Sequence, residues 1–177
     1  DLTSFFNFTA SHDGIGITPA RGILSDTDID ALIHLTEDHG GFVSYKANSD
    51  GSRSPYELNI SYFDAITDPR ITTQDPESAC KRFLCSQAMM LALMGVPGVY
   101  FRSLFGSRND VAGVETTGRY RSINREKLDA DVLVEELADD TAIRHHVFEG
   151  YRRLLKVRIG EPAFHPLGDQ IIHNLHP

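Results

Sequence analysis

Two kinds of hydrophobic pattern follow one another along the chain. The segments 4–10 (SFFNFTA) and 96–101 (VPGVYF) are short, apolar and rich in aromatic residues, which is typical of buried strands. After Ser25 or Asp26, apolar residues recur at helical spacing up to a glycine pair at 40–41, so a capped helix is expected there. This order of strand and helix indicates an α/β fold.

Three more helices are expected further along. The Asp-Pro-Glu sequence at 75–77 combines a capping side chain, a proline suited to the first helical position and an acidic first turn. The helix that begins there is expected to run to about Met94, with Gly95 at its end. Apolar repeats predict two other helices, near 131–137 and 141–157.

Shorter elements are predicted between these. Strands are expected at 42–46 and 56–60, separated by a loop at 47–55, and a turn of helix is expected at 62–66. The segment 103–125 contains several glycines and arginines and is predicted to be one long loop. Loops longer than about 15 residues inside a compact domain are usually functional.

Two parallel strands cannot close a sheet on their own. Strands with a near-continuous apolar pattern are normally covered on both faces. The segments 4–10 and 96–101 therefore require partner strands that the sequence does not contain. The segment 162–177 contains prolines and an alternating pattern, which predicts the start of a β element.

Composition narrows the class of protein. The chain has 177 residues and a formal net charge of −8, so nucleic acid and anionic membrane surfaces are not expected as partners. No apolar run is long enough to span a membrane. The amino terminus lacks the features of a signal peptide and resembles a cut through a larger protein.

The cysteines and histidines do not indicate a metal or cofactor. Cys80 and Cys85 lie five residues apart, which points them to different faces of a helix and argues against a disulfide. They are interpreted as two small core residues of a cytoplasmic protein. No Cys/His pair has zinc-ligand spacing, and the adjacent His145 and His146 face different directions on a helix.

Three polar clusters follow predicted strands, which is where active sites lie in βα barrels. The first is the pair His12-Asp13, the second is the excursion 42–59, and the third is the arginine-rich stretch 108–125. An Asp beside a His can bind sugar hydroxyls or stabilise positive charge, but it can also simply form a turn. The arginines suit phosphate or paired hydroxyls, but surface ion pairs are an equally open interpretation.

Taken together, these clusters resemble a known family. Residues 7–16 (NFTASHDGIG) and 95–101 (GVPGVYF) are similar to the segments around the seventh and eighth barrel strands of the α-amylase superfamily, glycoside hydrolase family 13. The segments 54–59 (SPYELN), 104–110 (LFGSRND) and 118–129 (GRYRSINREKLD) narrow the resemblance to its sucrose phosphorylase subfamily, nearer the branch acting on sucrose 6′-phosphate or glucosylglycerate.

The resemblance implies a fold and a division of the chain. Residues 1–160 would be the carboxyl-terminal portion of a catalytic (β/α)8 barrel, with strands seven and eight and their helices. Residues 161–177 would begin the small β domain that follows the barrel, called domain C. The remainder of the same barrel would be the partner of this chain, and no cofactor or metal is implied.

The resemblance also implies a mechanism. Such enzymes retain configuration: an Asp nucleophile forms a glucosyl-enzyme, a Glu acts as acid and base, and inorganic phosphate releases α-glucose 1-phosphate. No position of this chain matches the nucleophile or the acid/base. Asp13 matches the third carboxylate, which stabilises the transition state, and His12 matches the His that binds the same glucosyl unit.

Further substrate-binding residues are carried over from the same motifs. An arginine near the glucose 4-hydroxyl falls at Arg121 when counted back from the segment 123–125, or at Arg119 when counted from Gly118, because the loop is about two residues longer than in plain sucrose phosphorylases. Substrate contacts are also assigned to four residues of the 42–59 excursion: Arg53, Tyr56, Glu57 and Asn59.

Glu57 departs from the pattern of plain sucrose phosphorylases, which carry a Gln on a mobile loop that serves the acceptor and the phosphate. A carboxylate there would repel phosphate unless Arg53 or Lys46 offsets its charge. This departure indicates a donor other than sucrose. Two alternatives remain: a hydrolase or transglucosylase of the same superfamily, and a non-catalytic half-barrel that needs a partner chain.

Overall fold

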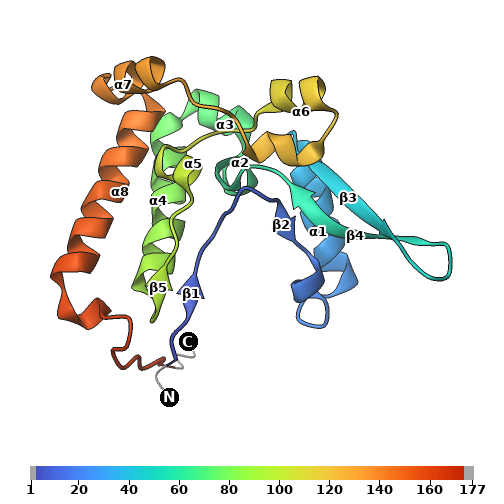
Figure 1. The fold of residues 1–177 in the computed structure, drawn as a ribbon, viewed down its shortest axis with the longest axis horizontal. Helices are drawn as coiled ribbons and strands as arrows, with labels where there is room; N and C mark the ends of the chain where they lie inside the picture. Colours follow the sequence, from blue (N-terminus) through green and yellow to red (C-terminus); the bar gives the residue numbers. More distant parts are fainter. Residues whose placement is uncertain (1–2, 174–177) are drawn as a thin grey trace.

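The computed structural model describes residues 3–173, in which short strands and helices alternate (Figure 1). The strands are β1 (Phe6–Asn7), β2 (Ile15–Gly16), β3 (Phe42–Ala47), β4 (Arg53–Asn59) and β5 (Val96–Pro97). The α-helices are α1 (Asp26–Asp38), α2 (Tyr62–Ile66), α3 (Pro69–Gln74), α4 (Pro76–Ala92), α5 (Phe101–Leu104), α6 (Val111–Thr117), α7 (Ala130–Ala138) and α8 (Ile143–Gly160). Short 3-10 helices are η1 (Thr18–Ala20), η2 (Tyr120–Asn124) and η3 (Pro162–Phe164).

The two apolar segments expected to form strands do pair in parallel. Phe6 lies opposite Val96 and Asn7 lies opposite Pro97, so β1 and β5 form a two-stranded ladder. The strands are much shorter than predicted, and Phe6 is 67% exposed rather than buried. The reason is that each strand has a partner on one edge only among the described residues. The remaining apolar surface of this ladder is uncovered.

One half of the molecule is built on a helical core. Helices α4 and α8 pack side by side, and α2 lies against them (Figure 1). Phe83 of α4 and Tyr151 of α8 are fully buried, and their rings meet in a T-shaped, edge-to-face contact. Burial raises the pKa of the Tyr151 hydroxyl, which donates to Gln87 Oε1 at 2.5 Å. Thr9, which follows β1, donates to the same oxygen at 3.0 Å, so the chain just before His12 is attached to this core.

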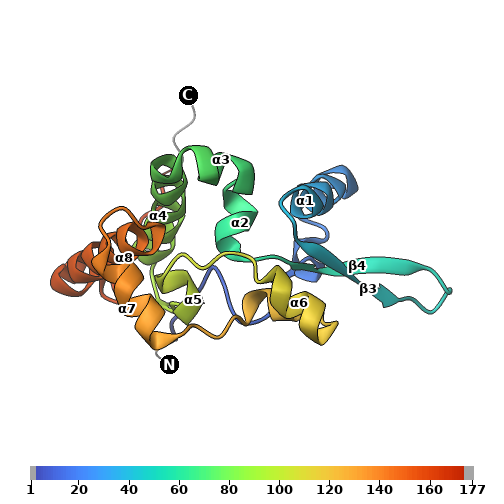
Figure 2. The ribbon, with the colours of Figure 1, turned by 90° about the horizontal axis from the view of Figure 1, so that it is seen from above.

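The other half is a small antiparallel sheet backed by one helix. The strand order is β2-β4-β3, and α1 packs on the sheet through Ile29 and Ile33 (Figure 2). Of the two predicted caps, Ser25 and Asp26, the helix uses Ser25. Its hydroxyl accepts from the Asp28 N–H, while the Asp28 carboxylate accepts from the Ser25 N–H. In Figure 2 the β3–β4 hairpin projects away from the helical half. The two halves are joined by the loop around Asp13 and by the segment from α5 to η2.

Several local predictions need correction. The long loop expected at 103–125 contains the last residues of α5, the whole of α6, and η2. Asp110 caps α6 by accepting from the Gly113 N–H, and Gly118 ends it with a φ of +65°. Helices of five to seven residues, such as α6, carry too few repeats to reveal a period. The loop expected at 47–55 is also shorter, because β4 already begins at Arg53.

The end of the chain confirms predicted helices but does not test the predicted division into domains. Helices α7 and α8 confirm the two helices expected there. After Gly160 the chain forms η3 and a turn, and no strand occurs between 161 and 173. The residues 174–177 lie outside the described part, so a β domain beginning at 161 stays a prediction.

Cys80 is buried in the helical core, and Cys85 is exposed, which corrects the interpretation of both as core residues. Their five-residue spacing turns Cys85 away from the core. Both are free thiols, and a cytoplasmic location stays a prediction. None of the described helices is both long and apolar enough to cross a membrane. No group of three or more metal-ligating side chains occurs among the described residues.

Candidate active site around Asp13

Asp13 lies in the loop between β1 and β2, where the two halves of the molecule meet. Its backbone N–H donates to the Ser11 hydroxyl at 3.1 Å, which gives the loop a tight turn. Its side chain is 37% exposed and lines a pocket of about 160 Å³ formed mainly by the loop itself. The turn and the functional interpretation of Asp13 are therefore compatible, since the turn uses the backbone and leaves the carboxylate in the pocket.

Two guanidinium groups from the segment after α6 converge on one oxygen of Asp13. Arg125 Nη2 lies 3.0 Å from Asp13 Oδ1, and Arg121 Nη1 lies 3.3 Å from the same atom. His12 is mostly exposed, and its Nε2 lies 3.7 Å from this oxygen. Arg121 lies within η2 and Arg125 is the residue that follows it, and both reach the same carboxylate.

Arg121 is also held by a buried carboxylate of the sheet. Its Nε and Nη2 donate to the two oxygens of Glu57, each at 3.0 Å, in a bidentate pair. The Glu57 side chain is 6% exposed, whereas that of Arg121 is 44% exposed. The hydrogen bonds from Arg121 to Glu57 raise the pKa of the Arg121 guanidinium. The charge of Glu57 is thus offset by Arg121, and not by Arg53 or Lys46 as expected.

The other residues predicted to bind substrate lie apart from Asp13. Asn59 is fully buried and donates to the Ser44 hydroxyl at 2.8 Å, inside the hairpin. Arg53 lies over the Tyr45 ring, and with Tyr56 it lines a separate pocket of about 550 Å³. Arg119 is exposed at the start of η2. The site around Asp13 therefore brings together His12, Glu57 and Arg121 from the predicted set.

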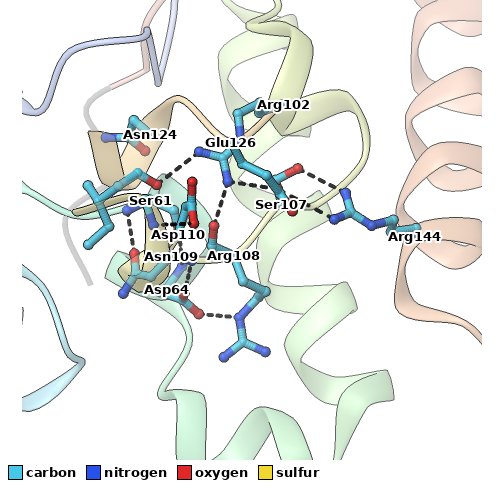
Figure 3. A network of polar contacts seen from close by, with 12 residues as sticks. Ser61, Asp64, Arg102, Ser107, Arg108, Asn109, Asp110, Asn124, Glu126 and Arg144 are labelled. Carbon is cyan, nitrogen blue, oxygen red and sulfur yellow. Dashed lines mark hydrogen bonds and ion pairs between the residues drawn. The ribbon is translucent and has the colours of Figure 1, made fainter. Parts of the chain in front are cut away.

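The arginine-bearing segment is anchored by the buried guanidinium of Arg102 (Figure 3). Its Nη1 donates to the Ile123 carbonyl at 2.9 Å, and its Nη2 donates to the Arg108 carbonyl at 2.7 Å. Nη2 also donates to the Glu126 carboxylate at 3.1 Å. Burial lowers the pKa of Arg102, with Glu126 acting in the opposite direction. One side chain thereby ties both ends of the segment to α5.

A second contact set in Figure 3 fixes the start of this segment. Arg108 pairs with the buried carboxylate of Asp64 and lies over the Phe63 ring at 5.5 Å. The Asn109 N–H donates to the other Asp64 oxygen at 2.7 Å, and its side-chain oxygen accepts from the Ser61 N–H at 2.8 Å. The arginine cluster seen in the sequence therefore divides. Arg108 is a scaffold residue, while Arg121 and Arg125 face Asp13.

Comparisons with known proteins show which proteins the chain is similar to. Three curated relatives named glucosylglycerate phosphorylase, among them those of Spirochaeta thermophila and Escherichia coli, are 44–50% identical over 93–97% of the chain. A protein from Ilumatobacter coccineus named sucrose 6(F)-phosphate phosphorylase is 27% identical over 89% of the chain. The chain is homologous to one segment of these phosphorylases. The resemblance to the sucrose phosphorylase group that the motifs predicted is confirmed.

The chain is short relative to these proteins. It spans 28–31% of the length of the three glucosylglycerate phosphorylases. Its fold matches the crystal structure of sucrose 6F-phosphate phosphorylase from Thermoanaerobacter thermosaccharolyticum with a TM-score of 0.72 and 21% identity, over 90% of this chain and 30% of that one. No protein-family model matches the chain.

Sequence reasoning missed the residues that hold the phosphorylase segment around Asp13. Asn124 donates from Nδ2 to the carbonyls of Asp13 at 3.2 Å and Ile60 at 3.0 Å, and Tyr100 donates to the Asn124 carbonyl at 2.5 Å. These contacts join positions more than 20 residues apart, so no local pattern reveals them. The sequence feature that could have indicated them is the short motif 123–125. In it, Asn124 and Arg125 directly follow Ile123, which is fully buried.

Replacing Arg102 should destabilise the complete protein. Arg102→Met would leave the Ile123 and Arg108 carbonyls and the Glu126 carboxylate without their buried donor. Losing hydrogen bonds from a buried charged group costs about 2 kcal/mol of unfolding free energy. Glu126 keeps Arg144 as a partner, and the Ile123 carbonyl keeps the Asp110 N–H. Urea denaturation would measure this loss, with Arg70→Met as the control, because Arg70 makes an exposed pair with Asp68. Equal stability of the two variants would contradict the role given to Arg102.

Proposed function

We propose that the chain is part of a retaining α-glucoside phosphorylase that transfers glucose from glucosylglycerate to inorganic phosphate, giving α-glucose 1-phosphate. The observation that carries this proposal is the difference in identity: 44–50% to proteins named glucosylglycerate phosphorylase against 27% to the one named sucrose 6(F)-phosphate phosphorylase. The ordered motif set along the chain supports the same group.

In this proposal, residues 1–160 contribute strands seven and eight of a (β/α)8 barrel, and residues 161–177 begin domain C. The parallel pairing of β1 with β5 and the exposed apolar surface of that ladder support this placement. The nucleophilic Asp and the acid/base Glu would belong to the remainder of the barrel.

Asp13 would stabilise the positive charge that develops at the anomeric carbon. A fixed carboxylate acts most strongly on such a charge when it needs no reorganisation at the moment of reaction. Arg121 and Arg125 hold Asp13 through Oδ1, which supplies that fixed position. His12, next to Asp13 and mostly exposed, would contact the same glucosyl unit.

Glu57 would not repel the incoming phosphate as a free carboxylate would. Both of its oxygens accept from Arg121, so the pair carries no net charge. The pocket with Arg53 and Tyr56, which offers a cation and aromatic rings, is the adjacent surface for the acceptor part of the substrate. In this proposal Arg121 serves the glucosyl unit, and Arg53 lies on the side of the anionic acceptor.

The proposal is tested with the complete protein. Glucosylglycerate, sucrose 6′-phosphate and sucrose are each incubated with and without inorganic phosphate, and α-glucose 1-phosphate is measured. The expected result is phosphate-dependent product from glucosylglycerate at a higher kcat/KM than from the other two. Release of the non-glucosyl part of the donor at the same rate with and without phosphate would instead identify a hydrolase or transglucosylase. No glucosyl transfer from any donor would indicate a non-catalytic protein.

Asp13→Asn should lower kcat by about three orders of magnitude or more, because the interaction lost is one that strengthens in the transition state. The thermal midpoint should stay close to that of the unaltered protein, since Asn keeps the size of Asp and the backbone contact to Ser11. Steady-state kinetics and calorimetry would check both. Near-normal turnover would refute the role given to Asp13.

Arg121→Lys should raise KM for the glucoside by about tenfold, because Lys cannot reproduce the planar fork that engages Glu57 and Asp13 together. Arg119→Lys is the matched comparison, since Arg119 is two residues away and exposed. Initial-rate kinetics on both variants would show which of the two arginines binds the glucosyl unit. An effect confined to Arg119→Lys would show that the family's glucose-binding arginine corresponds to Arg119 and not to Arg121.

A further inference from the structure

We propose that Arg125 is a positioning residue of this site, which holds the Asp13 carboxylate by Oδ1 and thereby directs Oδ2 toward the ligand. The inference rests on the proposed function of Asp13 in glucosyl transfer, but not on phosphate as the acceptor. It assigns a role to a side chain for which neither the motifs nor the comparisons supply one.

The geometry of Arg125 fixes two features of Asp13 at once. Its Nε donates to the His12 carbonyl at 3.1 Å, and its Nη2 donates to Asp13 Oδ1 at 3.0 Å. A planar guanidinium that donates to a backbone carbonyl and to the following carboxylate sets the rotation of that carboxylate as well as its place. A lysine offers a single charged nitrogen and could satisfy one of these acceptors well.

The two carboxylate oxygens of Asp13 differ in their contacts with neighbouring side chains. Oδ1 receives Arg125, Arg121 at 3.3 Å, and His12 at 3.7 Å. Within the part of the chain that the structure describes, Arg125 donates a hydrogen bond to Asp13 Oδ1, and no side-chain hydrogen bond reaches Asp13 Oδ2. The carboxylate is 37% exposed and lines the pocket of about 160 Å³. Oδ2 is therefore the atom left for a sugar hydroxyl or a developing charge.

The backbone that presents Arg125 is itself held firmly. Its N–H donates to the Ser122 carbonyl at 2.9 Å at the end of η2. The preceding Asn124 is buried and donates to the carbonyls of Asp13 and Ile60. Asn124 therefore sets the distance between the two loops, and Arg125 sets the direction of the carboxylate.

Arg121 and Arg125 both contact Asp13 Oδ1, but they differ in their other contacts. Arg121 is also bound by Glu57, so its position follows that of β4. Arg125 makes no ion pair with a residue of β4 among the described residues, and its side-chain hydrogen bonds go to the loop that carries Asp13. Loss of Arg125 should consequently disturb Asp13 while leaving the Glu57–Arg121 pair in place.

The test uses Arg125→Met and Arg125→Lys in the complete protein, each made in the unaltered background and in an Asp13→Asn background. The substrate is α-glucosyl fluoride, an activated donor whose fluoride release can be followed even in slow variants and with any acceptor. Arg152→Met is the control, because Arg152 makes an ion pair with Glu149 on the surface of α8. Thermal midpoints are measured for every variant.

In the unaltered background, Arg125→Met should lower kcat by about 100-fold, the cost of misplacing a reacting group by roughly an ångström. Arg125→Lys should recover part of that loss, and Arg152→Met should change nothing. In the Asp13→Asn background, Arg125→Met should cost about threefold or less, because the carboxylate that it positions is already gone. This non-additivity is what a positioning role requires.

Two results would overturn the inference. One is an equal fold-loss from Arg125→Met in both backgrounds, which would mean that Arg125 acts independently of Asp13. The other is a kcat for Arg125→Met within about threefold of the unaltered enzyme. Since fluoride release reports transfer to water or phosphate alike, absence of phosphate dependence would count against the proposed acceptor only, and the comparison of backgrounds would still decide the role of Arg125.

Discussion

The buried guanidinium of Arg102 is the interaction on which the site depends most. It binds carbonyls from the start and the end of the segment 108–123, and it neutralises Glu126 just beyond. A charge removed from water is tolerated only when such partners surround it. Moving these carbonyls and the carboxylate away from Arg102 would leave its buried charge uncompensated, so their positions are fixed. Without Arg102, the segment that carries Arg121 and Arg125 would lose its fixed relation to α5.

A separate line of alternating charges includes the candidate catalytic carboxylate. Glu57 binds Arg121, Arg121 binds Asp13, and Asp13 binds Arg125. The members come from three separate parts of the chain: the sheet, the loop after β1, and η2. Each charge is compensated by its neighbour, so the site keeps a carboxylate oriented in a pocket without leaving an unpaired charge beside it.

Local patterns predicted the long elements and the residue at the centre of the site. Capping residues and helical spacing located α1, α4 and α8, because each has enough turns to show a period. The motif comparison selected Asp13 and Arg121, which lie together in the structure. What remained hidden was set by tertiary contacts: Arg108 pairs with Asp64 rather than with a ligand, and Arg121 takes the place expected of Arg53 or Lys46. Such pairings depend on which loops meet, and a single sequence does not carry that information.

The Glu57–Arg121 pair has a consequence for engineering. Because one guanidinium serves two carboxylates, the effect of changing residue 57 depends on what stands at 121, and single-site scanning would report both positions as intolerant. A library that varies this site should recombine the two positions as a block. Such a library would include variants with Gln at position 57, as in plain sucrose phosphorylases, together with substitutions at position 121 that compensate for the lost carboxylate. A search that changes one position at a time would miss these pairs.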